Sequence, residues 1–166
     1  MLVLAMALMA QDITEKAEGW TILTNFRKDE CIMSANLKSG ADVSFHWRPE
    51  KRAGVMIYRA PEFRSIKQNK KYRIEVGFIK AGKLDTGWGE RDATGDVGPD
   101  GSRGFMVVFS GKEVLSDLAA STKLGFWYKN ELVGAVPLTG SAKAIAAVRR
   151  CEKAVLTKQV RDPFEQ

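Results

Sequence analysis

The chain has 166 residues, of which 45% are hydrophobic and 9% aromatic, and it carries a formal net charge of +6. This composition excludes an intrinsically disordered chain, and the length predicts one globular domain with a sizeable hydrophobic core. The positive charge favours solubility and a general attraction to anionic partners, but it says nothing about the fold.

An uninterrupted apolar run, MLVLAMALMA, occupies residues 1–10 and is followed directly by polar sequence. Ten residues are too few to span a membrane, which takes about 20. The run is typical of the apolar core of a secretory signal peptide, with small residues for a cleavage site; the charged segment that usually precedes it is absent, as in a truncated signal. The alternative is a buried first helix or strand. We predict a signal at 1–10, one β-rich domain at 11–166 without a transmembrane segment, and a periplasmic or secreted location.

Apolar runs and polar–apolar alternation predict most of the remaining chain to be strands. The predicted strands cover 19–26, 31–37, 42–48, 53–60, 71–80 and 104–110, and a hairpin that turns at Asn130 covers 123–138. Their apolar faces predict a core that contains Phe45, Trp47, Tyr72, Ile74, Val76, Phe78 and Phe105. Many short strands with helices only late in the chain indicate a mainly β fold, an antiparallel β-sandwich or barrel.

Two helices complete this prediction, a short one near 113–119 and a C-terminal one that begins near Ser141. On the second helix, the spacing of Ala144, Val148 and Cys151 places them on one face, toward the sheet. Export would put the only two cysteines, Cys31 and Cys151, in an oxidising compartment, where they are expected to form a disulfide. Two separate buried thiols are the alternative.

Residues 81–104 are rich in glycine and acidic side chains, which predicts a long irregular loop. Within it Trp88 stands between two glycines, near Arg91 and Arg103. Because tryptophan and arginine are enriched among binding hot spots, these three residues form a candidate binding site. In the alternative, Trp88 folds back and plugs one end of the sandwich.

The segment FRSIKQNKKYR, residues 63–73, combines basic side chains with aromatic ones at both ends. Lys67, Lys70 and Lys71 are therefore a second candidate site, for a protein or an anionic envelope component. A solvated turn is the plainer interpretation. Nucleic acid is not the expected partner, since export would separate the chain from it.

No pattern in the chain predicts a metal site or a cofactor. Asp92, Asp96 and Asp100 lie four residues apart, whereas a calcium loop of the EF-hand kind places its ligands at every second residue. The glycines in the same region do not follow a strand and open a helix, as a phosphate-binding loop requires.

Catalysis is not predicted either. His46 is the only histidine, and no Gly-x-Ser-x-Gly motif offers a nucleophile. Acid–base chemistry by Glu75 with Asp85 or Glu90 stays open, because carboxylates distant in sequence meet only in the fold. We therefore expect a non-enzymatic protein without catalytic residues.

The segment KLGFWYKNELVGAVPLTGSAKAIAAVRRC, residues 123–151, resembles the end of small exported proteobacterial proteins of the invasion-associated locus B type. In that family a last strand pair leads through a Leu-x-Gly-like turn into an alanine-rich helix. The resemblance implies a periplasmic β-sandwich and carries over no active-site residues; this chain also has fewer cysteines. The resulting prediction is an exported, non-enzymatic binding or envelope-associated protein of unknown partner. A periplasmic hydrolase with an unrecognised site and a polyanion-binding module are the alternatives.

Overall fold

A computed structural model describes residues 12–80, 83–111 and 113–160. The predicted signal peptide at 1–10 lies outside these residues. The described elements are β1 (Ile13–Ala17), β2 (Trp20–Asn25), β3 (Glu30–Asn36), β4 (Asp42–Arg48), β5 (Ala53–Arg59), β6 (Lys71–Lys80), β7 (Lys83–Val97), β8 (Arg103–Ser110), α1 (Glu113–Ala120), β9 (Lys123–Tyr128), β10 (Glu131–Pro137) and α2 (Ser141–Val160).

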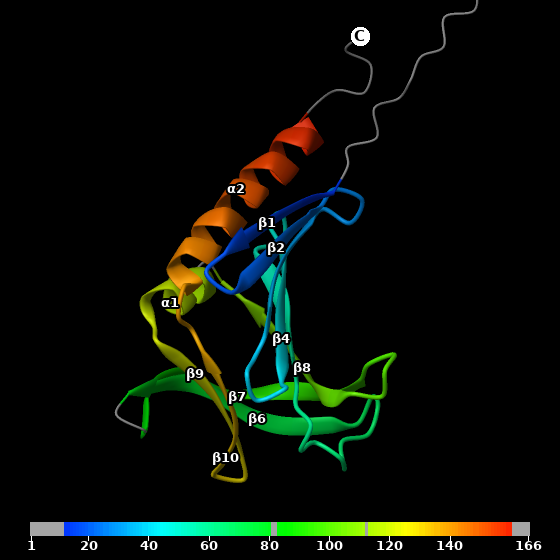
Figure 1. Cartoon of the computed structure of the whole chain (residues 1–166), viewed down its shortest axis with the longest axis vertical. Helices are drawn as coiled ribbons and strands as arrows, with labels where there is room; N and C mark the ends of the chain where they lie inside the picture. The colour runs from blue at the N-terminus through cyan, green and yellow to red at the C-terminus, as the bar shows by residue number, and fades with distance from the viewer. Residues whose placement is uncertain (1–11, 81–82, 112, 161–166) are drawn as a thin grey trace, which may run out of the picture.

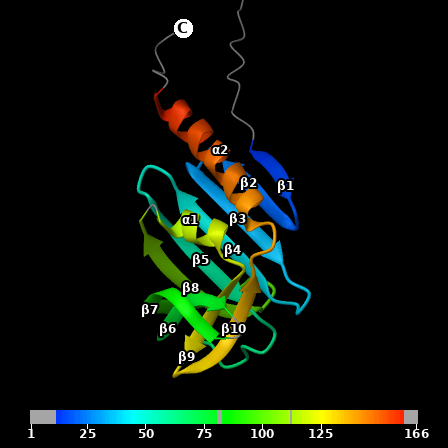
Figure 2. The same ribbon diagram turned by 90° about the vertical axis from the view of Figure 1, so that its left-hand side faces the viewer.

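The strands form one antiparallel sheet in the order β1-β2-β3-β4-β5-β8-β7-β6-β9-β10. The sheet is strongly curved, so that β9 and β10 lie across the core from β4 and β5 (Figures 1 and 2). Across the core, the Tyr58 ring of β5 packs on Gly134 of β10, where a Cβ would lie 2.5 Å from Tyr58 Cε1. The mainly β antiparallel fold predicted from the sequence is confirmed.

The concave side of the sheet holds the hydrophobic core. Six of the seven predicted core residues are buried, namely Phe45, Trp47, Ile74, Val76, Phe78 and Phe105, and Tyr72 is half-buried. Aromatic rings meet at the centre, where Tyr58 lies 4.8 Å from Phe126 between ring centroids. Alternation along the strands therefore predicted correctly which face points inward.

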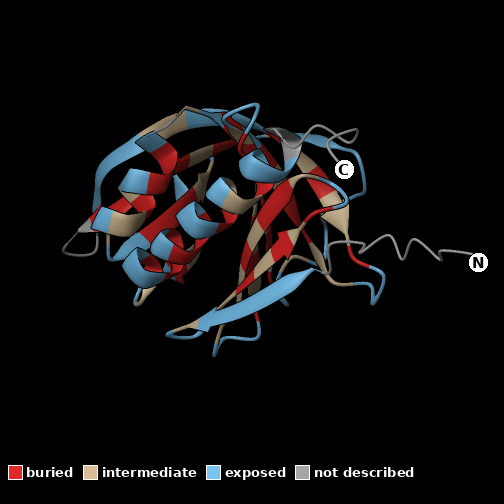
Figure 3. Cartoon of the chain, turned by 90° about the horizontal axis from the view of Figure 1, so that it is seen from above, coloured by how far each residue is buried: buried red, intermediate tan, exposed pale blue. Residues whose placement is uncertain are grey.

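Helix α2 lies against β1, β2 and β3, and α1 packs beside its first turns (Figures 1 and 3). The face of α2 that points toward the sheet is the one predicted from the sequence, because Ala144, Val148 and Cys151 are buried and Arg149 is exposed. Cys31 and Cys151 form the predicted disulfide, with their Cα atoms 6.0 Å apart. The bond ties the C-terminal helix to an early strand.

The hairpin predicted around Asn130 is also present. Lys129 and Asn130 both have positive φ, 52° and 66°, in the two-residue turn between β9 and β10. This combination defines a type I′ turn, whose twist matches that of the flanking strands.

The prediction of an irregular loop at 81–104 is wrong. Residues 83–97 form β7, the longest strand, which pairs with β6 on one side and with β8 on the other. Two of its glycines are close-approach positions: a Cβ at Gly87 would lie 2.6 Å from Gly77 Cα, and one at Gly95 would lie 2.1 Å from Lys67 O. The glycines that suggested a loop thus allow neighbouring backbones to meet.

Neither of the two described helices combines the length and hydrophobicity needed to cross a membrane.

Candidate functional site

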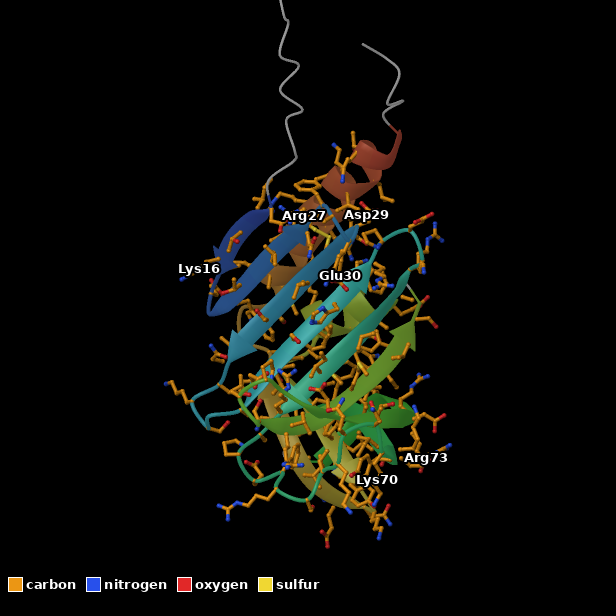
Figure 4. The ribbon with its side chains drawn as sticks, turned by 90° about the vertical axis from the view of Figure 1, so that its right-hand side faces the viewer. Lys16, Arg27, Asp29, Glu30, Lys70 and Arg73 are labelled. Atoms are coloured by element: carbon orange, nitrogen blue, oxygen red, sulfur yellow. A yellow bond between two sulfur atoms is a disulfide. The ribbon has the colours of Figure 1, made fainter. Side chains whose placement is uncertain are left out.

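The convex face of the sheet carries an apolar surface where solvated polar residues are the rule. Six side chains make up this outer apolar band: Leu23, Ile32, Val55, Ile57, Met106 and Val108. They come from β2, β3, β5 and β8, and Val108 is 63% exposed. Figure 4 shows this face, with the helices behind the strands.

Strand register aligns the band into rows that run across the strands. Leu23, Ile32, His46, Val55 and Val108 are successive cross-strand partners in one row. Ser44, Ile57 and Met106 form the next row in the same way. The band is therefore two rows deep on β5 and β8 and one row deep on β2 and β3, where the second row continues through Ser34 and Thr21; at β4 the outward residues of both rows are polar.

A charged row borders the band along one side. Arg59 of β5 donates from Nε to Asp96 Oδ2 of β7 at 2.7 Å and lies 3.4 Å from Asp42 Oδ2 of β4. All three side chains are partly shielded from solvent, so this three-residue network also fixes the relative positions of three strands.

Glu30 lies at the opposite side of the band and is only 7% exposed. Its Oε1 lies 3.6 Å from His46 Nδ1 and 3.8 Å from Arg48 Nε. His46 Nε2 lies 3.1 Å from Ser44 Oγ, so Ser44, His46 and Glu30 form a chain of polar contacts.

This chain of contacts has the residue types of a hydrolase triad but lacks its setting. Ser44 and His46 lie on β4, which pairs on both sides with β3 and β5. The N–H groups of a strand paired on both sides are used in the ladder, whereas an oxyanion hole needs free donors. The backbone N–H groups of β4 beside Ser44 are therefore taken up by the ladder.

At the β7 end of the band the charges are paired as well. Arg73 donates from Nε to Glu90 Oε1 at 2.8 Å and from Nη1 to Asp92 Oδ1 at 3.2 Å. The hydrogen bond to Glu90, followed by the two negative charges, raises the pKa of Arg73. Lys71 Nζ donates to Thr94 Oγ1 at 2.8 Å, and Arg91 is exposed beside them.

Two shallow depressions mark this face. One, of about 350 Å³, lies over Val55 and Ile57 and reaches Glu30. The other, of about 510 Å³, reaches Arg73. Because Met106 and Val108 line both, the depressions form one continuous surface with an apolar centre and charged ends.

The structure separates the predicted site residues instead of gathering them. Trp88 is half-buried: its ring centroid lies 5.5 Å from that of Phe78 and 5.5 Å from that of Phe109, and its Nε1 donates to Asp117 Oδ2 at 2.9 Å. Arg103 Nη1 donates to the Ile66 carbonyl at 2.6 Å. Trp88 is therefore packed against the core, as in the alternative interpretation of the sequence, and is not an exposed binding residue of a loop.

The basic run at 63–73 divides in the same way. Lys71 lies at one end of the outer apolar band, whereas Lys67 and Lys70 are exposed on the segment that leads into β6. Figure 4 shows Lys70 at the end of the molecule opposite α2. The sequence did not single out the outer apolar band, although its signal was present in the continuous apolar run 104–110.

Asp92, Asp96 and Asp100, the three aspartates considered for calcium, each have a different partner. Asp92 pairs with Arg73 and Asp96 with Arg59, while Asp100 accepts hydrogen bonds from Ser102 Oγ at 2.7 Å and from its backbone N–H at 3.0 Å. Those bonds from Ser102 lower the pKa of Asp100. Within 12–80, 83–111 and 113–160, no three His, Cys, Asp or Glu side chains are grouped to hold a metal ion.

Comparisons of the chain with protein-family models, with curated proteins and with solved structures find no match.

Proposed function

We propose that this chain is an exported, non-enzymatic binding protein of the cell envelope that docks a protein partner on its outer apolar band. The single observation that carries the proposal is the exposure of Val108 at the β8 end of the outer apolar band, on the convex side of the sheet. In an antiparallel sheet that face is normally polar, and contiguous exposed apolar patches mark interaction sites.

The surroundings of the band favour a protein as the partner. An apolar centre with a charged rim of both signs is the anatomy of a protein–protein interface. Acidic side chains at the rim disfavour a polyanion: Arg73 and Arg59 each contact two carboxylates there. The charges at the rim therefore support selection of a complementary protein surface.

Two observations support export. The apolar run at 1–10 has the composition of a signal-peptide core. The Cys31–Cys151 disulfide is stable in oxidising compartments and is rare in the cytosol. The resemblance of residues 123–151 to exported envelope proteins of the invasion-associated locus B type agrees with the same compartment.

Site-specific crosslinking tests the function. A photoreactive benzophenone amino acid replaces Val108 in the band or, as the matched control, Leu132 of β10, which is 51% exposed outside the band. In the native host we expect an adduct with another protein from position 108 and none from 132. With that protein purified, Val108→Asp should weaken binding at least tenfold, and Leu132→Asp should not.

Three results would contradict the proposal: no adduct at position 108, the same adduct from both positions, or an adduct with a second copy of the chain. Equal affinity of the wild-type protein and Val108→Asp for the purified partner would contradict it as well. Circular dichroism of both variants checks that the substitutions leave the fold intact.

A further inference from the structure

A separate apolar pocket lies at the end of the molecule opposite α2, away from the outer apolar band. It has a volume of about 180 Å³ and lies between the 61–70 segment, β6, β8, β9 and β10. Ile74 and Phe105 form its buried floor, and Phe63, Ile66, Tyr72 and Tyr128 are among its half-buried walls. We call it the tyrosine pocket.

Val133 completes the wall because of a β-bulge. Leu132 pairs with Trp127 and Gly134 with Phe126, so Val133 is an extra residue in β10. A bulge redirects a side chain, and here Val133 lines the pocket while its neighbour Leu132 is exposed. Leu132 and Val133 therefore offer an adjacent pair, one outside the pocket and one inside.

The wall formed by the 61–70 segment is held by contacts to other strands. Arg103 Nη1 donates to Ile66 O at 2.6 Å, and the Lys67 N–H donates to Tyr72 Oη at 3.2 Å. Gln68 Oε1 accepts from the Val97 N–H at 2.6 Å. A pocket whose wall is fixed before binding loses less conformational entropy when a ligand enters.

Size and walls together indicate an aromatic ring as the bound group. A pocket of this volume is smaller than sites for drug-sized ligands, but a cavity of about 150 Å³ is enough to hold benzene. Tyr72 and Tyr128 meet edge to face, with ring centroids 6.2 Å apart, and Phe63 stands 5.8 Å from Phe105. Rings at such angles favour a further ring in edge-to-face or offset contact.

Charge around the tyrosines favours an anionic head group. Lys70 Nζ lies 5.5 Å from the Tyr72 ring centroid, and Lys129 Nζ lies 5.4 Å from that of Tyr128. Lys67 is exposed nearby, and Glu62 is the one acidic residue that lines the pocket among the described residues. Lys70 and Lys129 thus lie against the two tyrosine rings that line the pocket, where they can offset the carboxylate of Glu62 and attract an anionic group on a bound ring.

We propose that the tyrosine pocket binds a small aromatic carboxylate, with the ring against the edge-to-face pair of Tyr72 and Tyr128 and the carboxylate near Lys70 and Lys129. This site assigns a role to Phe63, Lys70 and Tyr72 of the run at 63–73, whereas Lys71 and Arg73 of the same run lie at the end of the outer apolar band. It is independent of the band and of the protein partner proposed above.

Three probes that share one ring test the site: phenylacetate, 2-phenylethanol and phenethylamine, titrated into the disulfide-bonded protein and followed by amide NMR shifts. For a ligand of this size we expect phenylacetate to bind with a Kd of about 1 mM. The alcohol should bind at least threefold more weakly, and the cation more weakly still. The largest shifts should come from Tyr72, Tyr128 and Val133.

Matched variants separate the pocket from its surface. Val133→Phe, which fills the pocket, should abolish binding, and Leu132→Phe should leave the Kd unchanged. Lys70→Gln combined with Lys129→Gln should reduce the affinity for phenylacetate to that for 2-phenylethanol and remove its salt dependence. Native-like amide spectra of each unliganded variant check the fold.

No shifts at about 10 mM phenylacetate, ten times the expected Kd, would overturn the site. Tighter binding of phenethylamine, or an unchanged Kd in Val133→Phe, would overturn the assigned ligand or its position. None of these results depends on whether residue 108 crosslinks to a protein.

Discussion

The indole Nε1 of Trp47 on β4 donates a hydrogen bond to Glu152 Oε1 on α2 at 2.6 Å, between residues 105 positions apart in the chain. Glu152 directly follows Cys151, whose partner Cys31 is paired with Trp47 in the β3–β4 register. The disulfide therefore joins this turn of α2 to β3, and the partly buried hydrogen bond joins the same turn to the neighbouring strand β4.

Replacement of both cysteines by alanine should lower the free energy of unfolding by about 5 kcal/mol in the chain-entropy account of a loop this long. The sequence separation of 120 residues sets this value, because the bond restricts a large part of the unfolded chain. Denaturant unfolding of the variant and of the wild type measures the difference. Two alkylatable thiols in the unreduced native protein would contradict the bond itself.

The strands with alternating sequence could be predicted, and those held mainly by neighbours could not. In β6 the alternation of Ile74 and Val76 with polar residues identified both strand and face. β1 has four exposed residues in succession and no apolar face, so local sequence gave no signal for it. β7 was missed because hydrogen bonds to two flanking strands hold it in place, and its glycines resemble those of a loop.

The candidate sites were harder to predict, because each depends on register between distant strands. The run 104–110 predicted a central strand, and β8 is central, but its outward residues Met106 and Val108 remain on the surface. A strand with apolar residues on both faces can be buried on both sides or can expose one face as a binding surface. The sequence of β8 alone does not distinguish these two cases, because the outcome depends on what covers the sheet formed with β5 and β7. Trp88 is the extra residue of a β-bulge, since Val76 pairs with Gly89 and Gly77 with Gly87, and Gly89 has a φ of 71°. The bulge interrupts the alternation of polar and apolar residues, so the sequence predicted a loop at this position.

Truncation of Trp88 should affect stability. Trp88→Ala removes ring contacts with Phe78 and Phe109 and the hydrogen bond to Asp117, and should lower the free energy of unfolding by about 3 kcal/mol.

Phe78→Ala, at a buried position, should lower the free energy of unfolding by about 3–5 kcal/mol. The double variant should lose less than the sum, by about 0.5–1.5 kcal/mol, because the two rings contact each other. A loss below about 1 kcal/mol for either single variant in urea unfolding would show that its ring is not packed.

Limited proteolysis distinguishes a paired β7 from an open loop. Trypsin should not cut the native protein first at Arg91 or Arg103, because their backbones lie in strands that are paired within the sheet. Early cleavage is expected after exposed residues in the turns between strands, such as Lys28 and Lys38. Intact-mass measurement of the first fragments identifies the sites, and a first cut at Arg91 would show that β7 opens in solution.

Tyr58 gives the protein an alkaline limit to its stability. Burial raises the pKa of Tyr58, the charge of Glu62 adds to the effect, and a backbone hydrogen bond from Ala135 acts in the opposite direction. Between the ordinary tyrosine pKa of about 10 and the raised pKa of the folded state, the unfolded chain has released this proton and the folded chain still holds it. The contribution of Tyr58 is therefore fully present below about pH 10 and is lost as the pH rises toward the folded pKa.

Urea unfolding of the wild type and of Tyr58→Phe at a series of pH values from 8 to 11 measures this contribution. The variant lacks the ionising group, so the difference in unfolding free energy between the two proteins should be constant up to about pH 10 and should shift in favour of the variant above it. A difference that stays constant through pH 11 would contradict the raised pKa of Tyr58.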